Sequence, residues 1–266
     1  MNRKRFKNCL MWLKLIVDMN NLFSLEGKTI LVTGASSGIG KATACLCAGM
    51  GAKVVALGKS EQRLDETIST LSGEGHVKMA LDLTDDNDVD LAVCDLPQLD
   101  GVANCAGVAN MNPFQFVSRQ EMDEVFSINF FLPVMLVNKL LKAKKLQKGC
   151  SIVFVSSIDG PKMVHAGNSV YAATKTALVG MARNMAIDLV SKKIRVNCVL
   201  PGTTDTPMIR TSNVTEEMLQ ETAKNLPMKR FAKPEEIANS IVFLLSEASS
   251  YMTGTELVVD GGCSIV

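Results

Sequence analysis

Short runs of apolar residues alternate along the chain with longer segments whose apolar residues recur every three or four positions. The short runs are continuous and rich in Val, Ile and Leu, which is typical of strands buried on both faces of a parallel sheet. They are Thr29–Val32, Lys53–Leu57, His76–Ala80, Leu99–Ala103, Ser151–Val155, Ile194–Val199 and Glu256–Val259. The pattern therefore predicts a parallel sheet of about seven strands.

The longer segments between these runs have the periodicity of helices. Two carry helix-start signals: Ser118 can cap a helix that has Glu121 three positions later, and Pro234 stands where a first turn tolerates proline. The candidates include Ile39–Met50, Ser60–Leu71, Ser118–Leu146, Ser169–Ser191 and Pro234–Ser246. Because strands and helices alternate, we expect a doubly wound α/β fold with right-handed crossovers and helices on both faces of the sheet.

No stretch rich in Pro, Gly or Ser divides the chain, so we predict a single domain over residues 25–266 and an N-terminal extension over residues 1–24. The extension begins MNRKRFKNCLMWLKLIVD, which is basic and then apolar. Lys14 and Asp18 interrupt the apolar part, and no small-x-small cleavage site follows, which disfavours a signal peptide. An amphipathic helix on a membrane surface and a loosely docked tail both remain open, and we favour the tail. We therefore expect deletion of residues 1–18 to leave soluble, active protein.

The charge balance and the cysteines exclude several classes of protein. The 28 Lys and Arg residues are matched by 27 Asp and Glu residues, so the chain lacks the basic excess of a nucleic-acid-binding protein. No apolar run reaches the ~18 residues of a membrane span. The eight cysteines have no C-x-x-C spacing and the chain has only two histidines, so we expect no metal site and reduced thiols, as in the cytoplasm.

A glycine-rich segment with the sequence TGASSGIG, Thr33–Gly40, follows the first predicted strand and opens the next helix. Glycines permit a sharp turn and a close approach of the backbone to a pyrophosphate, while the helix N-terminus offers unpaired N–H groups. The spacing G-x-x-x-G-x-G differs from G-x-G-x-x-G, and by itself the segment also fits a tight strand-to-helix turn. Within a repeated strand–helix pattern, we favour a dinucleotide site.

Several motifs together make the chain resemble the short-chain dehydrogenase/reductase family. After TGASSGIG, the segment Asn104-Cys105-Ala106-Gly107 resembles the family's N-N-A-G, with Cys105 in place of the second Asn. Pro201-Gly202 follows the sixth predicted strand, and Asp260-Gly261-Gly262 stands near the chain end. The resemblance implies a Rossmann-type oxidoreductase domain over residues 25–266. It also implies a catalytic tetrad of Asn129, Ser157, Tyr171 and Lys175.

The chemistry of this tetrad can be followed from the residue types. Tyr171 and Lys175 are four positions apart on one helix, so their side chains project from the same face. A phenol with a pKa of about 10 holds its proton too tightly near neutrality, so we expect Lys175 and an oxidised nicotinamide to lower the pKa of Tyr171. Ser157 ends the fifth strand and can hydrogen-bond the substrate oxygen. Ser156 competes for this role, and the family's S-x-x-G pattern selects Ser157 through Gly160.

Asn129 has an explanation that does not depend on the resemblance. Pro133, four residues later, lacks an N–H and clashes with the Asn129 carbonyl, so the helix is expected to kink there and leave that carbonyl free. A free carbonyl near Lys175 can hold a water that links the lysine to solvent and completes a proton relay. A kinked core helix with a capped polar residue is the alternative, and we favour the relay.

The end of the second strand indicates which nicotinamide cofactor to expect. An NAD-preferring fold carries Asp or Glu there to bind the ribose 2′-OH, whereas this strand continues into Gly58-Lys59-Ser60. Lys59 can neutralise a 2′-phosphate, so we expect NADP rather than NAD, with a solvated turn lysine as the alternative interpretation. Including the positions that the resemblance implies, the expected cofactor-binding residues are Gly34, Ser36, Ser37, Gly38, Ile39, Gly40, Lys59, Asp82, Leu83, Asn104, Ala106, Gly107, Tyr171, Lys175, Pro201, Gly202 and Thr206.

The residues that surround a substrate are less informative. Thr203–Leu226 is long enough to form a lid, and the loop that carries Asp159 and His165 lies opposite, with His165 expected to be exposed. Ser157 and Tyr171 are fourteen positions apart, one more than the family's commonest spacing, which changes the shape of the pocket.

Three functions fit these residues. We expect an NADP-dependent reductase of a small-molecule carbonyl compound, with 3-oxoacyl-[acyl-carrier-protein] reduction as the first hypothesis. A sugar, polyol or hydroxysteroid dehydrogenase that oxidises an alcohol is the second, and a non-catalytic nucleotide-binding sensor is the third. The family resemblance further implies a homo-oligomer, a tetramer or a dimer, in which the helices of Asn129 and Tyr171 pack between subunits.

Overall fold

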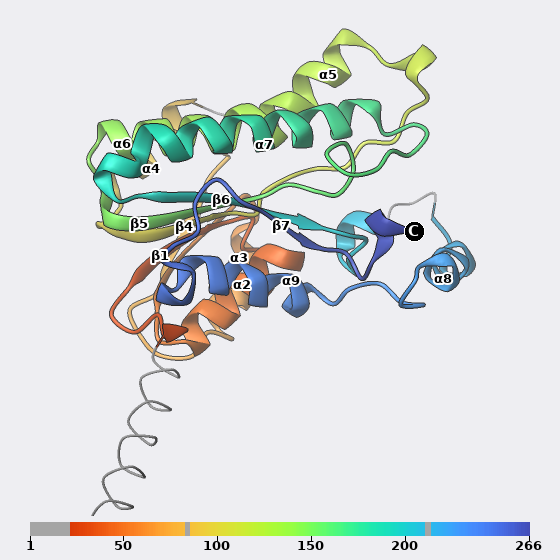
Figure 1. Cartoon of the computed structure of the whole chain (residues 1–266). Helices are drawn as coiled ribbons and strands as arrows, with labels where there is room; N and C mark the ends of the chain where they lie inside the picture. The colour runs from red at the N-terminus through yellow and green to blue at the C-terminus, as the bar shows by residue number, and fades with distance from the viewer. Residues whose placement is uncertain (1–21, 83–85, 211–213) are drawn as a thin grey trace, which may run out of the picture.

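A computed structural model describes residues 22–82, 86–210 and 214–266 of the chain (Figure 1). The N-terminal segment 1–18 and the expected cofactor residue Leu83 lie outside the described residues. Both expectations therefore stay predictions.

The sheet has seven parallel strands in the order β3-β2-β1-β4-β5-β6-β7. The strands are β1 (Thr29–Thr33), β2 (Lys53–Gly58), β3 (Val77–Ala80), β4 (Leu99–Asn104), β5 (Leu146–Val155), β6 (Arg195–Pro201) and β7 (Glu256–Val259). From the neighbouring strands β1 and β4, the chain adds strands outward in opposite directions: first β2 and β3, then β5 to β7. In such sheets, ligands bind at the carboxyl ends of the strands where the order reverses. The doubly wound fold that the alternating pattern predicts is confirmed.

Helices cover both faces of the sheet (Figure 1). The described α-helices are α2 (Gly38–Gly49), α3 (Glu61–Ile68), α4 (Asp86–Asp95), α5 (Arg119–Phe126), α6 (Leu132–Lys142), α7 (Ser169–Leu189), α8 (Glu216–Asn225) and α9 (Pro234–Leu245). Short 3-10 turns are η1 (Phe114–Phe116), η3 (Val190–Lys192), η4 (Pro207–Ile209), η5 (Glu247–Ser249) and η6 (Cys263–Ile265). Helices α4, α6 and α7 lie on one face and α2, α3 and α9 on the other, while α8 stands beyond the carboxyl ends of the strands.

Two apolar cores form because successive residues of a strand point to opposite faces of the sheet. In β1, Leu31 packs into the core under α6 and α7, while Ile30 and Val32 pack into the core under α2 and α9. All three side chains are fully buried. This two-sided burial explains why the strand sequences lack a regular polar alternation.

The helix predicted over Ser118–Leu146 is wrong at its C-terminal end. The helix ends at Lys142, and Leu146 instead begins β5, where it pairs with Leu99 of β4. At its start the prediction is confirmed, because the Ser118 hydroxyl accepts a hydrogen bond from the Glu121 N–H at 3.1 Å. A π-helical segment, η2 (Ser127–Phe131), joins α5 to α6 just before Pro133, so the helix is disturbed where the proline predicts.

The continuous helix Arg119–Lys142 that these segments form is long and apolar enough, by length and composition alone, to cross a membrane. Its apolar residues Leu136 and Leu140 are buried in the core beneath it, and η2 packs against α7. These contacts account for its composition as that of a helix covering the sheet.

Candidate active site

The glycine-rich segment forms a tight turn from β1 into α2. Gly34 and Gly38 have φ angles of 66° and 51°, a region that favours glycine. A Cβ at Gly40 would lie 2.2 Å from the Gly34 carbonyl oxygen, so only glycine fits where α2 begins. Helix α2 has no acidic residue in its first turn. The turn therefore presents backbone N–H groups and a positive dipole end to an anion.

Loops from two other strands close around this turn. The Thr33 hydroxyl accepts hydrogen bonds from the N–H groups of Cys105 and Ala106, both at 3.1 Å, which fastens the loop after β4 to the end of β1. A Cβ at Gly38 would lie 3.1 Å from the Thr206 methyl group, so the segment after β6 reaches the same place. Three loops expected to bind one cofactor thus meet at the point where the strand order reverses.

Asn104 shows that these loops suit a polar ligand. Its side chain is 3% exposed, and neither the oxygen nor the nitrogen of its amide has a hydrogen-bond partner among the described residues. A buried amide without partners costs about 1–3 kcal/mol. The Asn104 amide has no partner in the described part of the chain, and the glycine turn has no room for a Cβ. Both features fit a dinucleotide bound in this position.

The end of β2 carries an ion pair. The Lys59 ammonium lies 2.7 Å from the Asp82 carboxylate, and the Lys59 side chain is 78% exposed. A Cβ at Gly58 would lie 3.3 Å from the Ser36 hydroxyl, so this end of β2 adjoins the glycine turn. The pairing brings together two of the expected cofactor residues.

Tyr171 and Lys175 both start from α7 and lie side by side. The Lys175 ammonium is 5.6 Å from the centre of the Tyr171 ring and donates a hydrogen bond to the Val155 carbonyl at 2.9 Å. Lys175 is 4% exposed. The Tyr171 hydroxyl is hydrogen-bonded to Ser157. The fold thus brings the phenol, the lysine and the serine to one place at the end of β5.

In the protein alone the pKa of Tyr171 is raised, and the expected lowering by Lys175 together with an oxidised nicotinamide stays a prediction. Burial raises the pKa of Tyr171 to about 12, and this outweighs the lowering by its hydrogen bond with Ser157. Burial also lowers the pKa of Lys175 to about 8. Because the lysine gives up its charge more readily, it is a weaker partner for a phenolate than a solvated ammonium.

The two neighbouring serines have different partners. The Ser156 hydroxyl donates to the Lys175 carbonyl of α7 at 2.8 Å, which commits it to the backbone. The Ser157 hydroxyl accepts from the Asp159 N–H at 3.1 Å and also reaches Tyr171. Only Ser157 therefore faces the phenol.

Asn129 lies in η2 and clamps the loop after β4. Its amide oxygen accepts from the Val108 N–H and its nitrogen donates to the Val108 carbonyl, both at 2.9 Å. The nitrogen also donates to the Thr174 hydroxyl at 3.2 Å. A Cβ at Gly107 would lie 3.2 Å from the Asn129 amide oxygen and 3.4 Å from the Lys175 ammonium, so Asn129 adjoins the lysine across a glycine. The proton relay stays a prediction.

Comparison with known proteins assigns the family. A family model described as Enoyl-(Acyl carrier protein) reductase matches residues 34–264. The chain is 37% identical over 251 residues to the 3-oxoacyl-[acyl-carrier-protein] reductase FabG of Thermotoga maritima, covering 91% of this chain and 99% of that protein. A solved short chain dehydrogenase/reductase family protein is 34% identical with a TM-score of 0.81, covering 91% of this chain and 100% of that one. The chain belongs to the short-chain dehydrogenase/reductase family.

A further relative extends the comparison. A structure from Beutenbergia cavernae, proposed to be an NAD(P)-dependent gluconate 5-dehydrogenase and carrying NADP at low occupancy, is 30% identical with a TM-score of 0.82. It covers 91% of this chain and 98% of that one. As a short-chain dehydrogenase/reductase, this chain is an NAD(P)-dependent oxidoreductase that acts on CH–OH groups.

The short-chain dehydrogenase/reductase pattern points to side chains but not to the backbone groups that hold them. The Val155 carbonyl, which accepts from Lys175, and the backbone of Val108, which Asn129 clamps, are absent from the sequence prediction. No residue type marks such groups, because every residue carries a carbonyl and most an N–H. Thr33 is also absent from the predicted site residues. The sequence does carry a signal for it, because it is the first residue of TGASSGIG, directly before Gly34 at the end of β1.

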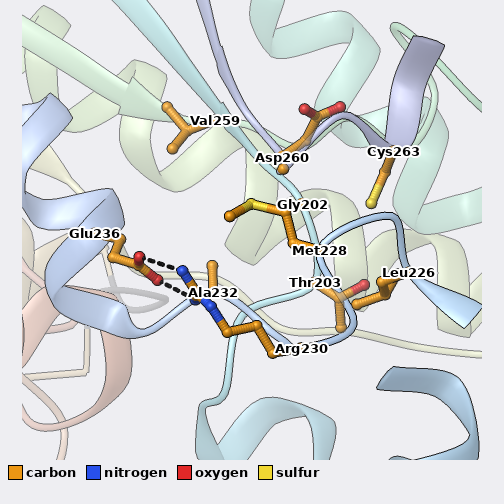
Figure 2. A pocket seen from close by; sticks show the side chains of 11 residues that line it. Gly202, Thr203, Leu226, Met228, Arg230, Ala232, Glu236, Val259, Asp260 and Cys263 are labelled. Atoms are coloured by element: carbon orange, nitrogen blue, oxygen red, sulfur yellow. Dashed lines mark hydrogen bonds and ion pairs between the residues drawn. The ribbon is translucent and has the colours of Figure 1, made fainter. Parts of the chain in front are cut away.

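A cavity of about 120 Å³ lies beside this site (Figure 2). Gly202 and Thr203 after β6, Leu226 and Met228 after α8, and Cys263 near the chain end are among the residues that line it. Gly202 takes part in the expected cofactor site, but Ser157, Tyr171 and Lys175 do not line the cavity. The reacting groups therefore lie outside it, and the cavity belongs to the base of the predicted lid.

Proposed function

We propose that this chain is an NADP-dependent reductase of 3-oxoacyl thioesters. The observation that carries the proposal is the meeting of Ser157, Tyr171 and Lys175 at the end of β5, beside the loops that fit a dinucleotide. The 37% identity to a 3-oxoacyl-[acyl-carrier-protein] reductase over nearly the whole of both chains supports the substrate class.

In this reaction the chain's own residues handle the proton. When bound, the nicotinamide supplies the hydride that the carbonyl carbon accepts. The Ser157 hydroxyl donates a hydrogen bond to the carbonyl oxygen and stabilises the negative charge that develops there. Tyr171 gives its proton to that oxygen, so the ketone becomes an alcohol and the phenolate regains a proton afterwards. Its raised pKa in the protein alone keeps the phenol protonated and ready to donate.

The residues proposed to hold the cofactor come from every loop at the switch point. The turn Gly34–Gly40 would hold the pyrophosphate, while Asn104 and Lys175 would hydrogen-bond the ribose groups. Lys59, which pairs with Asp82 in the protein alone, would neutralise the 2′-phosphate that distinguishes NADP. The NADP recorded with the Beutenbergia cavernae relative supports this preference.

A sugar or polyol dehydrogenase is the second candidate. Asp159, Asn168 and His165 place polar groups beside Ser157, whereas an acyl chain requires an apolar surface. The relative proposed to be a gluconate 5-dehydrogenase favours the same alternative.

We also propose a cytoplasmic homo-oligomer. The helix formed by η2 and α6 exposes Phe131 and Met135, which are 53% and 41% exposed. Large exposed apolar side chains on one helix are typical of a subunit interface. Analytical ultracentrifugation tests the oligomeric state, and a strictly monomeric protein would contradict the homo-oligomer.

The substrate is tested by consumption of NADPH and NADH over a panel of ketones: a 3-oxoacyl thioester, a keto sugar acid and a ketosteroid. We expect the highest kcat/KM with the thioester and NADPH. A preference for the sugar acid would replace the first candidate by the second. No turnover of any member, in either direction, would contradict an enzyme of this class. Tyr171→Phe serves as the inactive control.

A further inference from the structure

The cavity of about 120 Å³ lies at the carboxyl ends of β6 and β7, and the hydrogen bonds between neighbouring strands connect it to the reacting groups (Figure 2). The Ile158 N–H, directly after Ser157, donates to the Pro201 carbonyl at the end of β6 at 3.1 Å. The next residue, Gly202, lines the cavity and donates through its N–H to the Val259 carbonyl of β7 at 3.0 Å. Ser157 and the cavity are therefore about one strand spacing apart, or about 5 Å.

The cavity reaches the face of the sheet on which Tyr171 lies. Cys263 lines the cavity and packs against the core under α6 and α7. Met163, in the loop that leads to α7, packs against the same core. Val259 and Ala232 also line the cavity, but they pack against the core under α2 and α9. The cavity thus extends around the edge of the sheet, from the side of α9 to the side of the reacting groups.

The charged groups that line the cavity already have partners within the chain. The Arg230 guanidinium donates to both oxygens of the Glu236 carboxylate, each at 2.7 Å (Figure 2). The Asp260 carboxylate accepts from the N–H groups of Gly262 and Ser264, at 2.9 and 2.8 Å. A ligand that used these charges would have to replace bonds that are already made. The cavity therefore favours an apolar ligand over a charged one.

The remaining side chains of the lining are mostly apolar. Among the described residues, those other than Thr203 are Leu226, Met228, Ala232, Val259 and Cys263. Met228 lines the cavity while 57% exposed, so it lies at the mouth, and its unbranched side chain can adjust to ligands of different length. An apolar cavity of about 150 Å³ holds a molecule the size of benzene, so this cavity has room for about four or five carbon atoms.

We propose that this cavity receives the distal end of the acyl chain of a 3-oxoacyl thioester and so selects substrates of medium chain length. The inference rests on the proposed function, and it supplies the apolar surface that the polar groups beside Ser157 do not. From a carbonyl group held at Ser157, the chain crosses about 5 Å to the cavity, or about four bonds of ~1.2 Å each. A chain of about ten to twelve carbons then fills the cavity, whereas a 3-oxobutanoyl chain ends before it.

The first test measures kcat/KM with NADPH for the 3-oxobutanoyl, 3-oxohexanoyl, 3-oxodecanoyl and 3-oxohexadecanoyl thioesters. Each methylene group that enters the cavity contributes a factor of about four to kcat/KM. We therefore expect kcat/KM to rise about tenfold to a hundredfold from the 3-oxobutanoyl to the 3-oxodecanoyl thioester and to gain nothing further with the longest chain. Turnover of all four thioesters with equal kcat/KM would overturn the inference and leave the proposed function intact.

A pair of matched variants assigns the chain-length preference to the cavity. Cys263→Phe places a ring in the cavity, and it is expected to bring the ratio of kcat/KM for the 3-oxodecanoyl and 3-oxobutanoyl thioesters close to one. Cys94→Phe makes the same substitution at an exposed cysteine on α4 and is expected to keep the ratio of the unaltered protein. Circular dichroism checks that both variants are folded. An unchanged ratio in Cys263→Phe, or an equal fall in both variants, would contradict the inference.

The second test observes the cavity of the unaltered protein without turnover. Iodoacetamide alkylates thiols, and mass spectrometry of the peptides gives the labelling rates of Cys263 and, as an internal reference, of the exposed Cys94. Burial raises the pKa of the Cys263 thiol, so labelling is followed at alkaline pH. S-decyl-pantetheine and S-ethyl-pantetheine serve as ligands, because a thioether cannot acylate a thiol.

We expect the decyl compound, at about ten times its dissociation constant, to slow the labelling of Cys263 about tenfold. The ethyl compound is expected to leave Cys263 unchanged, and neither compound is expected to change the labelling of Cys94. Equal labelling of Cys263 with both compounds would overturn the inference. Protection of Cys263 by the decyl compound, together with no turnover of any thioester, would instead support a cavity for an alkyl chain and contradict the proposed function.

Discussion

The two halves of the site at the carboxyl edge of the sheet are built differently. In the catalytic half, Asn129, Ser157 and Lys175 are buried and each is hydrogen-bonded within the chain. In the cofactor half, the buried Asn104 amide has no partner among the described residues, and the principal feature is a glycine turn. The fold itself orients the catalytic side chains, whereas the cofactor half offers backbone and polar groups to a ligand.

This difference teaches what each half tolerates. A change in the catalytic half removes a partner from a satisfied network and so affects stability together with turnover. A change in the cofactor half alters space and polarity around the ligand and so affects binding. The variants below test this division, from the largest expected effect to the smallest.

Gly40→Ala is expected to weaken cofactor binding by about tenfold to a hundredfold or more. The added Cβ would lie 2.2 Å from the Gly34 carbonyl oxygen, so the turn must open, at a cost of about 1–3 kcal/mol or more. Isothermal titration with NADPH measures the loss. Gly49→Ala, at the other end of α2 with nothing within 4 Å of the new Cβ, is the control and is expected to bind normally. Equal binding by both variants would contradict the steric account of the turn.

Lys175→Met is expected to destroy turnover while making the protein more stable at pH 7. Burial lowers the pKa of Lys175 from 10.5 to about 8, so the charged form costs the folded state about 3 kcal/mol below pH 8. Loss of the bond to Val155 offsets about 1 kcal/mol of the gain. Above the unfolded pKa both states are neutral, so the variant's advantage must shrink as the pH rises from about 8 past 10.5. Urea unfolding of both proteins over this range measures it, and an advantage that grows with pH would refute the assignment.

Asn129→Ala is expected to lower the free energy of unfolding by about 2 kcal/mol, because it leaves the N–H and carbonyl of Val108 without their partner. Turnover is expected to fall, while the dissociation constant of NADPH changes little. Denaturation and steady-state kinetics give the two numbers. Unchanged turnover would remove both the clamp and the proton relay from the mechanism.

Lys59→Ala is the smallest expected change. It should weaken NADPH binding about tenfold and leave NADH binding almost unaffected, since an exposed charge-assisted contact contributes about 1.5 kcal/mol. The ratio of kcat/KM for the two cofactors measures this preference. If kcat/KM falls equally with both cofactors, the role of Lys59 is instead to stabilise the turn through its ion pair with Asp82.

The sequence predicts the fold better than the electrostatics of the site. All seven apolar runs fall on strands. In the strands between the two edges, burial on both faces of the sheet leaves a continuous apolar pattern, whereas the edge strands β3 and β7 are only partly buried. The end of α6 was missed because Leu146 continues an apolar periodicity that does not distinguish a helix from a strand. The raised pKa of Tyr171 was missed because desolvation depends on the packing of distant segments. The contact between Asp159 and His165 is not predictable from the sequence either, because it depends on how their loop turns.

The central claim, that Tyr171 transfers the proton, is tested most directly by single-turnover reduction of a 3-oxoacyl thioester with saturating NADPH, comparing Tyr171→Phe with the unaltered protein. Phenylalanine keeps the ring and removes only the hydroxyl. The account predicts a rate lower by about a hundredfold to ten-thousandfold, with an unchanged dissociation constant for NADPH. A rate within threefold of the unaltered protein would contradict it.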